Sequence, residues 1–177
     1  MSALVLRDPL GWWRSWYKYG RRRGDRDPAW RQLPRTFGAF VDVSSDLTLS
    51  NPQASWLLAR TRVMFDSPHA RPDRLADTAM RRHHDAGPTM ELLDRLLSRV
   101  TALGTTEQLN GVYRTTCRAM GWEPAFDEAV RENRSKLAQE ALDLTPAQED
   151  RLLGLTRIDT WMAERAERAG SVVTGRL

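Results

Sequence analysis

The apolar positions of the chain begin with a short continuous run, residues 3–6, which stops at Arg7-Asp8-Pro9. An apolar run of this length that ends at a proline break is typical of a buried strand. The aromatic-rich segment that follows, residues 11–19, predicts a helix. The pattern therefore predicts a strand, a tight turn and a helix at the start of the chain.

Farther along the chain, most apolar positions recur with helical spacing. They predict helices over residues 52–64, 89–98, 109–120 and 146–169. The last two are preceded by capping boxes, Thr105 to Gln108 and Thr145 to Gln148. Residues 100–103 predict a second short strand, and residues 38–43 predict a short strand or an extended loop. We expect a loop over residues 24–37.

Length and composition indicate a soluble globular protein. The chain has 177 residues, of which 41% are hydrophobic and 28% charged, and this balance is ordinary for a protein with a buried core. We expect a single, partial domain over residues 1–170 and a flexible tail over residues 171–177. No apolar run approaches the length of a membrane span and the amino terminus has no apolar signal region, so we expect a cytoplasmic location.

Candidates for metal or disulfide chemistry are few. The single cysteine, Cys117, excludes an internal disulfide framework and a multi-cysteine metal site, and its place on an apolar helix face predicts a core residue. The segment His83-His84-Asp85 fits a polar loop or helix end better than a metal site, because adjacent histidines on a helix point about 100° apart. We predict no metal.

The chain carries a net charge of +4, and nearly all of its cations are arginine. Arginine binds phosphate and sulfate with two parallel hydrogen bonds, which lysine cannot do. The segment Arg21-Arg22-Arg23 forms a local basic patch. This patch fits either a solvated helix end or a surface for nucleic acid or an anionic sugar polymer.

The predicted turn after the first strand has the features of an anion site. Arg7 leaves the strand at its carboxyl end, and Ser15 lies two turns along the following helix. A guanidinium and a hydroxyl together suit a phosphate. The helix amino terminus adds free N–H groups and a partial positive charge.

These residues also carry a family resemblance. Val5-Leu6-Arg7-Asp8-Pro9, followed by Trp12 to Tyr17, resembles the second nucleotide-binding motif of sulfotransferases, which transfer sulfate from 3′-phosphoadenosine 5′-phosphosulfate (PAPS). That motif has an apolar strand, Arg-Asp-Pro, and a Ser eight residues after the Arg, beside aromatic residues. The resemblance implies that Arg7 and Ser15 hold the 3′-phosphate of PAPS. A purely structural interpretation instead makes Arg7 and Asp8 a surface ion pair and the tryptophans plain core.

Later segments resemble the same family in the expected order, from about Leu4 to Ala166. Residues 100–109 resemble a strand-to-helix segment in which an apolar run ends in Gly-x-Thr-Glu. Further resemblances lie at Asn51-Pro52-Gln53, Gly121-Trp122, Asn133-Arg134-Ser135 and Asp159. Arg134 and Lys136 are additional candidates for a cofactor phosphate.

The family's phosphate loop for the 5′-phosphosulfate has no counterpart before Arg7, since Gly104-Thr105-Thr106 follows a different strand. The general base usually lies between the two motifs, so no catalytic residue is assigned. The resemblance therefore implies an α/β fold, a mostly helical remnant of a parallel-sheet, P-loop-like sulfotransferase domain with few short strands. We expect a missing amino-terminal half to supply the rest of the site, and the isolated chain to be inactive.

The expected reaction is transfer of a sulfuryl group from PAPS to the hydroxyl of an acceptor, a carbohydrate or a small molecule. The alternative is a non-catalytic, basic helical module that binds nucleic acid or an anionic polymer through Arg14 and Arg21-Arg22-Arg23. No helix-turn-helix spacing supports the nucleic-acid alternative. A third hypothesis is a helical scaffold whose strand edge pairs with a partner chain.

Overall fold

A computed structural model describes the fold over residues 2–24, 27–58, 86–126 and 142–170. Several sequence predictions lie outside these ranges: His83-His84-Asp85, the candidate phosphate ligands Arg134 and Lys136, the tail over 171–177, and the second half of the predicted helix 52–64.

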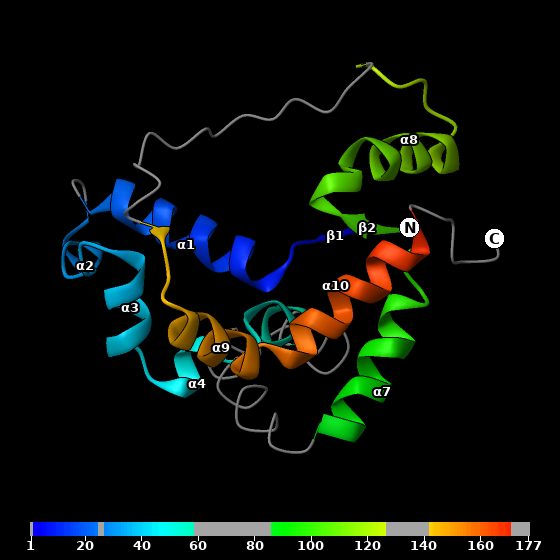
Figure 1. Ribbon diagram of the computed structural model, residues 1–177. Helices are drawn as coiled ribbons and strands as arrows, with labels where there is room; N and C mark the ends of the chain where they lie inside the picture. The colour runs from blue at the N-terminus through cyan, green and yellow to red at the C-terminus, as the bar shows by residue number, and fades with distance from the viewer. Residues whose placement is uncertain (1, 25–26, 59–85, 127–141, 171–177) are drawn as a thin grey trace, which may run out of the picture.

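The described chain is mostly helical, with one short pair of strands (Figure 1). Residues 52–58 form a helix in addition to the labelled elements. Those elements are β1 (Ala3–Leu6), α1 (Pro9–Arg23), α2 (Pro28–Arg31), α3 (Phe37–Val43), α4 (Asp46–Leu49), α7 (Ala86–Leu97), β2 (Ala102–Thr105), the 3-10 turn η2 (Thr106–Gln108), α8 (Leu109–Met120), α9 (Pro146–Leu155) and α10 (Arg157–Ala169).

The two strands are parallel and adjacent, with Ala3 opposite Ala102 and Leu6 opposite Thr105. Both were predicted, although β2 begins two residues later than the predicted 100–103. β2 is buried along its whole length, whereas β1 is buried only at its carboxyl end. Helices α8 and α10 contact both strands. The coarse α/β prediction is thereby confirmed for the described residues.

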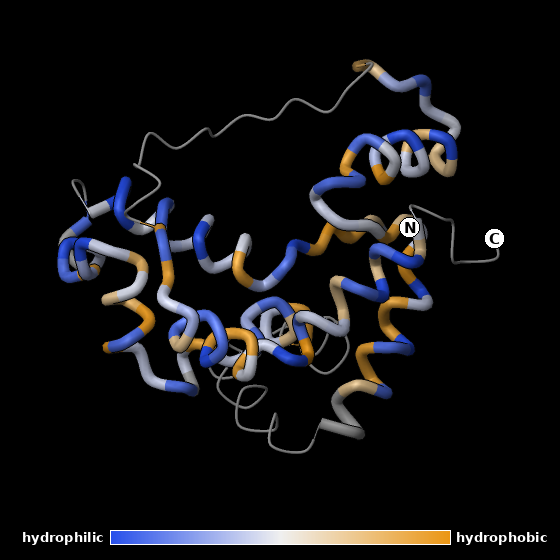
Figure 2. The backbone as a smooth tube through the Cα atoms, viewed as in Figure 1, coloured by the Kyte–Doolittle hydropathy of each residue, from blue (hydrophilic) through white to orange (hydrophobic). Residues whose placement is uncertain are grey.

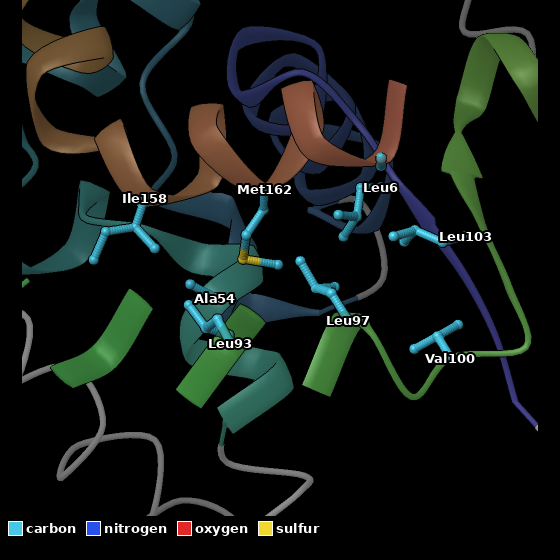
Figure 3. Packing of buried hydrophobic residues seen from close by; sticks show 9 residues of the cluster. Leu6, Ala54, Leu93, Leu97, Val100, Leu103, Ile158 and Met162 are labelled. Atoms are coloured by element: carbon cyan, nitrogen blue, oxygen red, sulfur yellow. The ribbon is translucent and has the colours of Figure 1, made fainter. Parts of the chain in front are cut away.

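Apolar residues gather in two clusters on either side of the turn between β1 and α1. The first joins the strands to α7 and α10, and Figure 3 shows Leu6, Leu97, Leu103 and Met162 converging from these four elements. Figure 2 shows hydrophobic residues recurring along α7 at helical spacing, as a helix packed on one face requires.

The second cluster is built on α1. Trp13 and Tyr17 pack against Phe37, Phe40 and other residues of α3 and α9. Most of the aromatic rings meet at tilted or edge-to-face angles, which is the preferred geometry for such pairs. Since the two clusters lie at the two ends of the β1–α1 turn, that turn is held from both sides.

Three sequence predictions are wrong in detail. Residues 38–43 belong to helix α3, not to a strand or extended loop, because the Thr36 hydroxyl accepts a hydrogen bond from Ala39 N at 3.2 Å and starts the helix. The predicted helix 146–169 is two helices separated at Thr156, whose ψ of 26° interrupts the regular turn. The expected loop 24–37 also contains the short helix α2.

Other predictions are confirmed. The capping box at Thr145 is formed, with Gln148 Oε1 accepting from Thr145 N at 2.9 Å and Pro146 at the first turn. Cys117 is buried in α8. No helix within the described ranges is both long and apolar enough to cross a bilayer.

Candidate anion-binding pocket

A pocket of about 610 Å³ runs along β1, where Leu4, Val5 and Leu6 line it, and continues past the carboxyl end of the strand. Arg7 and Ser15 both line it, so the fold brings the two predicted anion ligands to one cavity. Thr106, which follows β2, also lines it. In open parallel sheets, ligands characteristically bind outside the carboxyl ends of the strands.

Helix α1 divides its residues between the pocket and the core. Its pocket face consists of Trp12, Ser15, Trp16, Tyr19 and Arg22, which recur at helical spacing. The other face contributes residues that are buried against the second cluster, among them Trp13 and Tyr17. The tryptophans thus separate: Trp13 is core, whereas Trp12 and Trp16 are half-buried on the pocket wall.

The turn that carries Arg7 is fixed by Asp8. Its Oδ1 accepts a hydrogen bond from Gly11 N at 2.7 Å, so Asp8 caps the amino end of α1. A Cβ at position 11 would overlap Asp8 Oδ2, so a larger residue there would displace the capping carboxylate. Pro9 has no N–H to satisfy. Asp8 is therefore a helix cap, and not merely one half of a surface ion pair.

This cap changes the predicted anion site. We expected free N–H groups at the amino end of α1 to hold the anion, but the Gly11 N–H already donates to the Asp8 carboxylate. A second negative charge placed there would also be repelled by Asp8. We therefore build the candidate site on the side chains of the pocket wall.

Gln53 connects the pocket to the helix over residues 52–58. Its Oε1 accepts from Arg7 N at 3.0 Å, and its Nε2 donates to Arg7 O at 2.7 Å. One side-chain amide thereby satisfies both backbone groups of Arg7. Trp56 and Leu57 of the same helix form another part of the pocket wall.

The amino end of that helix is held in turn by α10. Gln53 N and Ala54 N donate to the two carboxylate oxygens of Asp159, at 2.9 and 2.8 Å. Asn51 Oδ1 accepts from Ile158 N at 2.9 Å and from Asp159 N at 3.2 Å. Each helix therefore receives hydrogen bonds at its amino end from a side chain at the amino end of the other.

Asp159 is fully buried. Its burial raises the pKa of the carboxyl to about 6, although the hydrogen bonds from Gln53 and Ala54 act in the opposite direction. The segment containing Asn51 and Gln53 and the helix containing Asp159 were separate points of resemblance in the sequence, and the fold joins them.

An acidic residue, Glu107, directly follows the pocket residue Thr106. Burial alone would raise the pKa of Glu107, but hydrogen bonds from its own backbone N–H, Thr106 and Thr105, together with the Arg7 charge, hold that pKa below its ordinary value. Thr106 Oγ1 donates to Glu107 Oε1 at 2.9 Å. Of these causes, the Arg7 charge has the smallest effect on the pKa of Glu107.

The three arginines of the basic patch at the end of α1 differ in their contacts. Arg21 Nη1 donates to Leu33 O at 3.3 Å, and Arg23 donates to the Tyr19 hydroxyl and lies over its ring. Arg22 lines the pocket. Of the three arginines, Arg22 is thus the one that adds positive charge to the cavity.

Sequence reasoning missed Arg22, Gln53 and Trp56 as pocket residues. Arg22 lies seven residues after Ser15, so helical spacing was a usable signal for it. Gln53 and Trp56 reach the pocket through a tertiary contact that the sequence does not reveal.

The described ranges hold no group of three His, Cys, Asp or Glu side chains placed to bind a metal ion. A comparison of the chain with protein-family models, with curated proteins and with solved structures finds no match.

Proposed function

We propose that this chain forms the 3′-phosphate-binding part of a PAPS-dependent sulfotransferase. The observation that carries the proposal is that Arg7 and Ser15, eight residues apart across a strand–turn–helix unit, line one pocket at the carboxyl end of a parallel strand. This is the spacing and the context of the second nucleotide-binding motif in that family.

The pocket fits such a nucleotide chemically. Arg7 and Arg22 offer guanidinium groups and Ser15 offers a hydroxyl, and these are donors suited to a phosphate. Trp12 and Trp16 offer half-buried aromatic surface for the adenine. The volume of about 610 Å³ lies within the range of about 300–1,000 Å³ for small-molecule sites.

The transfer itself needs groups that no described residue supplies. The acceptor hydroxyl, on a sugar or another small molecule, attacks sulfur in line. Its O–S bond forms as the bond from sulfur to the phosphate oxygen breaks, and adenosine 3′,5′-bisphosphate leaves. A base takes the hydroxyl proton, and cations stabilise the charge on the bridging oxygen. In this proposal, a further polypeptide segment contributes the base and the phosphosulfate loop.

The alternative, a basic module for nucleic acid or an anionic polymer, gains less from the structure. Its main feature was Arg21-Arg22-Arg23, but Arg21 and Arg23 are engaged with Leu33 and Tyr19. It therefore serves as the competing outcome of the test.

The test is calorimetric binding of adenosine 3′,5′-bisphosphate to the full chain. We expect saturable binding that weakens for adenosine 5′-monophosphate, which lacks the 3′-phosphate. Arg7→Ala and Ser15→Ala should each weaken binding roughly 10-fold or more, since a hydrogen bond to a charged group contributes about 1.5–3 kcal/mol.

Arg118→Ala is the matched control, because Arg118 is exposed on α8 and does not line the pocket. Absence of saturable binding to the wild-type chain would contradict the proposal. Equal losses of nucleotide affinity in Arg7→Ala and Arg118→Ala would also contradict it. If the chain in addition bound DNA tightly and in a salt-sensitive way, the alternative function would be favoured.

A further inference from the structure

A chain of hydrogen bonds runs from the buried carboxylate of Asp159 to the backbone of Arg7. Asp159 binds Gln53 N and Ala54 N, and the Gln53 side chain binds Arg7 N and Arg7 O. The partners are far apart in the sequence: Gln53 and Asp159 are 106 positions apart, and Arg7 and Gln53 are 46 positions apart. The link is therefore made by tertiary structure.

The link controls two parts of the pocket. Gln53 holds the backbone N–H and C=O of Arg7, and thereby the Cα that carries the guanidinium side chain. The helix that Asp159 holds also places Trp56 and Leu57 in the pocket wall. Because Asn51 caps α10 while Asp159 caps the helix over residues 52–58, neither helix can turn without breaking hydrogen bonds to the other.

A buried carboxylate is a costly way to cap a helix. Removing a charge from water carries a penalty that hydrogen bonds must offset. Among the described residues, no charged side chain contributes to the pKa shift of Asp159, whose causes are burial and its bonds to Gln53 and Ala54. An asparagine in the same position would avoid the penalty, but its side-chain NH₂ group, a donor, would replace one of the two carboxylate oxygens that now accept from Gln53 N and Ala54 N.

We propose that Asp159 is a positioning residue for the nucleotide pocket, acting through Gln53 to hold Arg7 at the carboxyl end of β1. The ligand-binding part of this inference rests on the proposed function. The hydrogen-bond part does not, because amide hydrogen exchange measures it without a ligand.

The first experiment follows amide exchange in Asp159→Asn. In this variant the asparagine NH₂ group replaces one carboxylate oxygen, so either Gln53 N or Ala54 N loses its acceptor. The amino end of the helix that carries Gln53 is then held less firmly. We expect exchange of the Arg7 amide to accelerate about tenfold or more. The Gly104 amide of β2, which faces β1 because it lies two residues after Ala102, should be unchanged. Asp150→Asn, an exposed change in α9, should alter neither amide. Equal acceleration of both amides would make Asp159 a general stability residue and overturn the proposal.

The second experiment uses Gln53. Gln53→Leu removes both bonds to Arg7 and should accelerate exchange of the Arg7 amide as Asp159→Asn does. The double variant should lose no more protection than Gln53→Leu alone, because both changes break one pathway. Additive losses at Arg7 would overturn the inference. If Asp159→Asn does not fold, Asp159→Glu, which displaces the same two oxygens, replaces it in both experiments.

Gln53→Glu provides a rescue that a merely structural role would not show. An ionised glutamate can accept a hydrogen bond from Arg7 N, but its second oxygen repels Arg7 O. The protonated acid can accept from Arg7 N and donate to Arg7 O, as the glutamine amide does. Exchange protection at Arg7, corrected for the intrinsic pH dependence, should therefore recover in this variant as pH falls through the glutamate pKa. Protection that stays low would count against the Gln53 clamp.

Adenosine 3′,5′-bisphosphate binding completes the series. Asp159→Asn and Gln53→Leu should each weaken binding about tenfold, without an additive effect in the double variant. If the wild type does not bind this nucleotide while the exchange results hold, the proposed function fails and the positioning link stands. If the wild type binds and both variants bind equally well, the positioning role fails.

Discussion

Gly20 lies directly against the indole of Trp30. A Cβ at position 20 would come within 2.4 Å of Trp30 Cε3 and within 2.6 Å of Leu33 Cδ1. The indole is held in place, because its ring centroid lies 5.0 Å from that of Trp16 and 5.9 Å from that of Tyr19. Since Trp16 and Tyr19 line the pocket, this close approach supports the pocket wall from behind.

Gly20→Ala should therefore destabilise the protein. The added methyl group meets a ring that cannot move freely, and overpacking of this kind costs about 1–3 kcal/mol. Gly154→Ala is the matched change, because nothing lies within 4 Å of a Cβ at that exposed helical position, and alanine should stabilise the helix by about 0.5–1 kcal/mol. Urea unfolding of both variants measures the difference. Equal effects on stability would show that Trp30 does not restrict position 20.

The pH dependence of stability should carry the signature of Asp159. Its pKa is about 6 in the folded protein and 3.8 in the reference state, so the folded state binds the proton more tightly. The stabilisation from this group is therefore complete below about pH 4 and is lost as pH rises through 6. Its size is on the order of 3 kcal/mol.

The measurement is the difference in unfolding free energy between the wild type and Asp159→Asn from pH 4 to pH 7. The difference removes the contributions of other titrating groups. As pH falls from 7 to 4, the unfolding free energy of the wild type should rise relative to that of Asp159→Asn. A difference that is constant across this range would place the pKa of Asp159 elsewhere.

Glu107→Gln should strengthen binding of the nucleotide. The carboxylate shares the positive charge of Arg7, and glutamine removes the competing negative charge while keeping the side-chain size. Because Glu107 is exposed, we expect a gain of about two- to fivefold at low salt. Glu164→Gln, an exposed change on α10, serves as control, and the gain should disappear in high salt. Weaker binding by Glu107→Gln would instead make the carboxylate part of the site.

Arg22→Ala and Arg23→Ala distinguish the nucleotide pocket from a general basic surface. Arg22 lines the pocket, whereas Arg23 is engaged with Tyr19. Arg22→Ala should weaken binding of adenosine 3′,5′-bisphosphate roughly fivefold, and Arg23→Ala should have a smaller effect. Titration with the nucleotide and, separately, with duplex DNA measures both. Equal losses of DNA binding with no change in nucleotide binding would favour the basic module.

Local signals explain which elements the sequence could predict. β1 is a continuous apolar run closed by Pro9, and the capping box at Thr145 depends on side chains three residues apart, so both were predicted correctly. Helix α3 was missed because Gly38, Val41 and Val43 favour other conformations, and burial of Phe37 and Phe40 against α1 outweighs that preference. The break at Thr156 was missed because the side chain that accepts hydrogen bonds from the first turn of α10, Asn51, is distant in sequence.

The pocket follows the same rule. Arg7 and Ser15 could be paired from the sequence because one strand–turn–helix unit carries both. Gln53 and Asp159 could not, since their roles depend on how α10 meets the helix over residues 52–58. The cap at Asp8 could have been anticipated from Asp-Pro before a helix, and it would have corrected the expectation of free N–H groups there.

The Gln53 amide also limits how β1 can associate with other chains. Ser2 O accepts hydrogen bonds from Thr101 N and Ala102 N of the β2 segment, so alternation directs the backbone groups of Ala3, Val5 and Arg7 to the opposite edge. Gln53 already occupies those of Arg7. An incoming strand could therefore pair with no more than two residues of β1. A sheet edge this short is a poor template for edge-to-edge aggregation, so the residue that orients Arg7 also protects the strand from uncontrolled self-association.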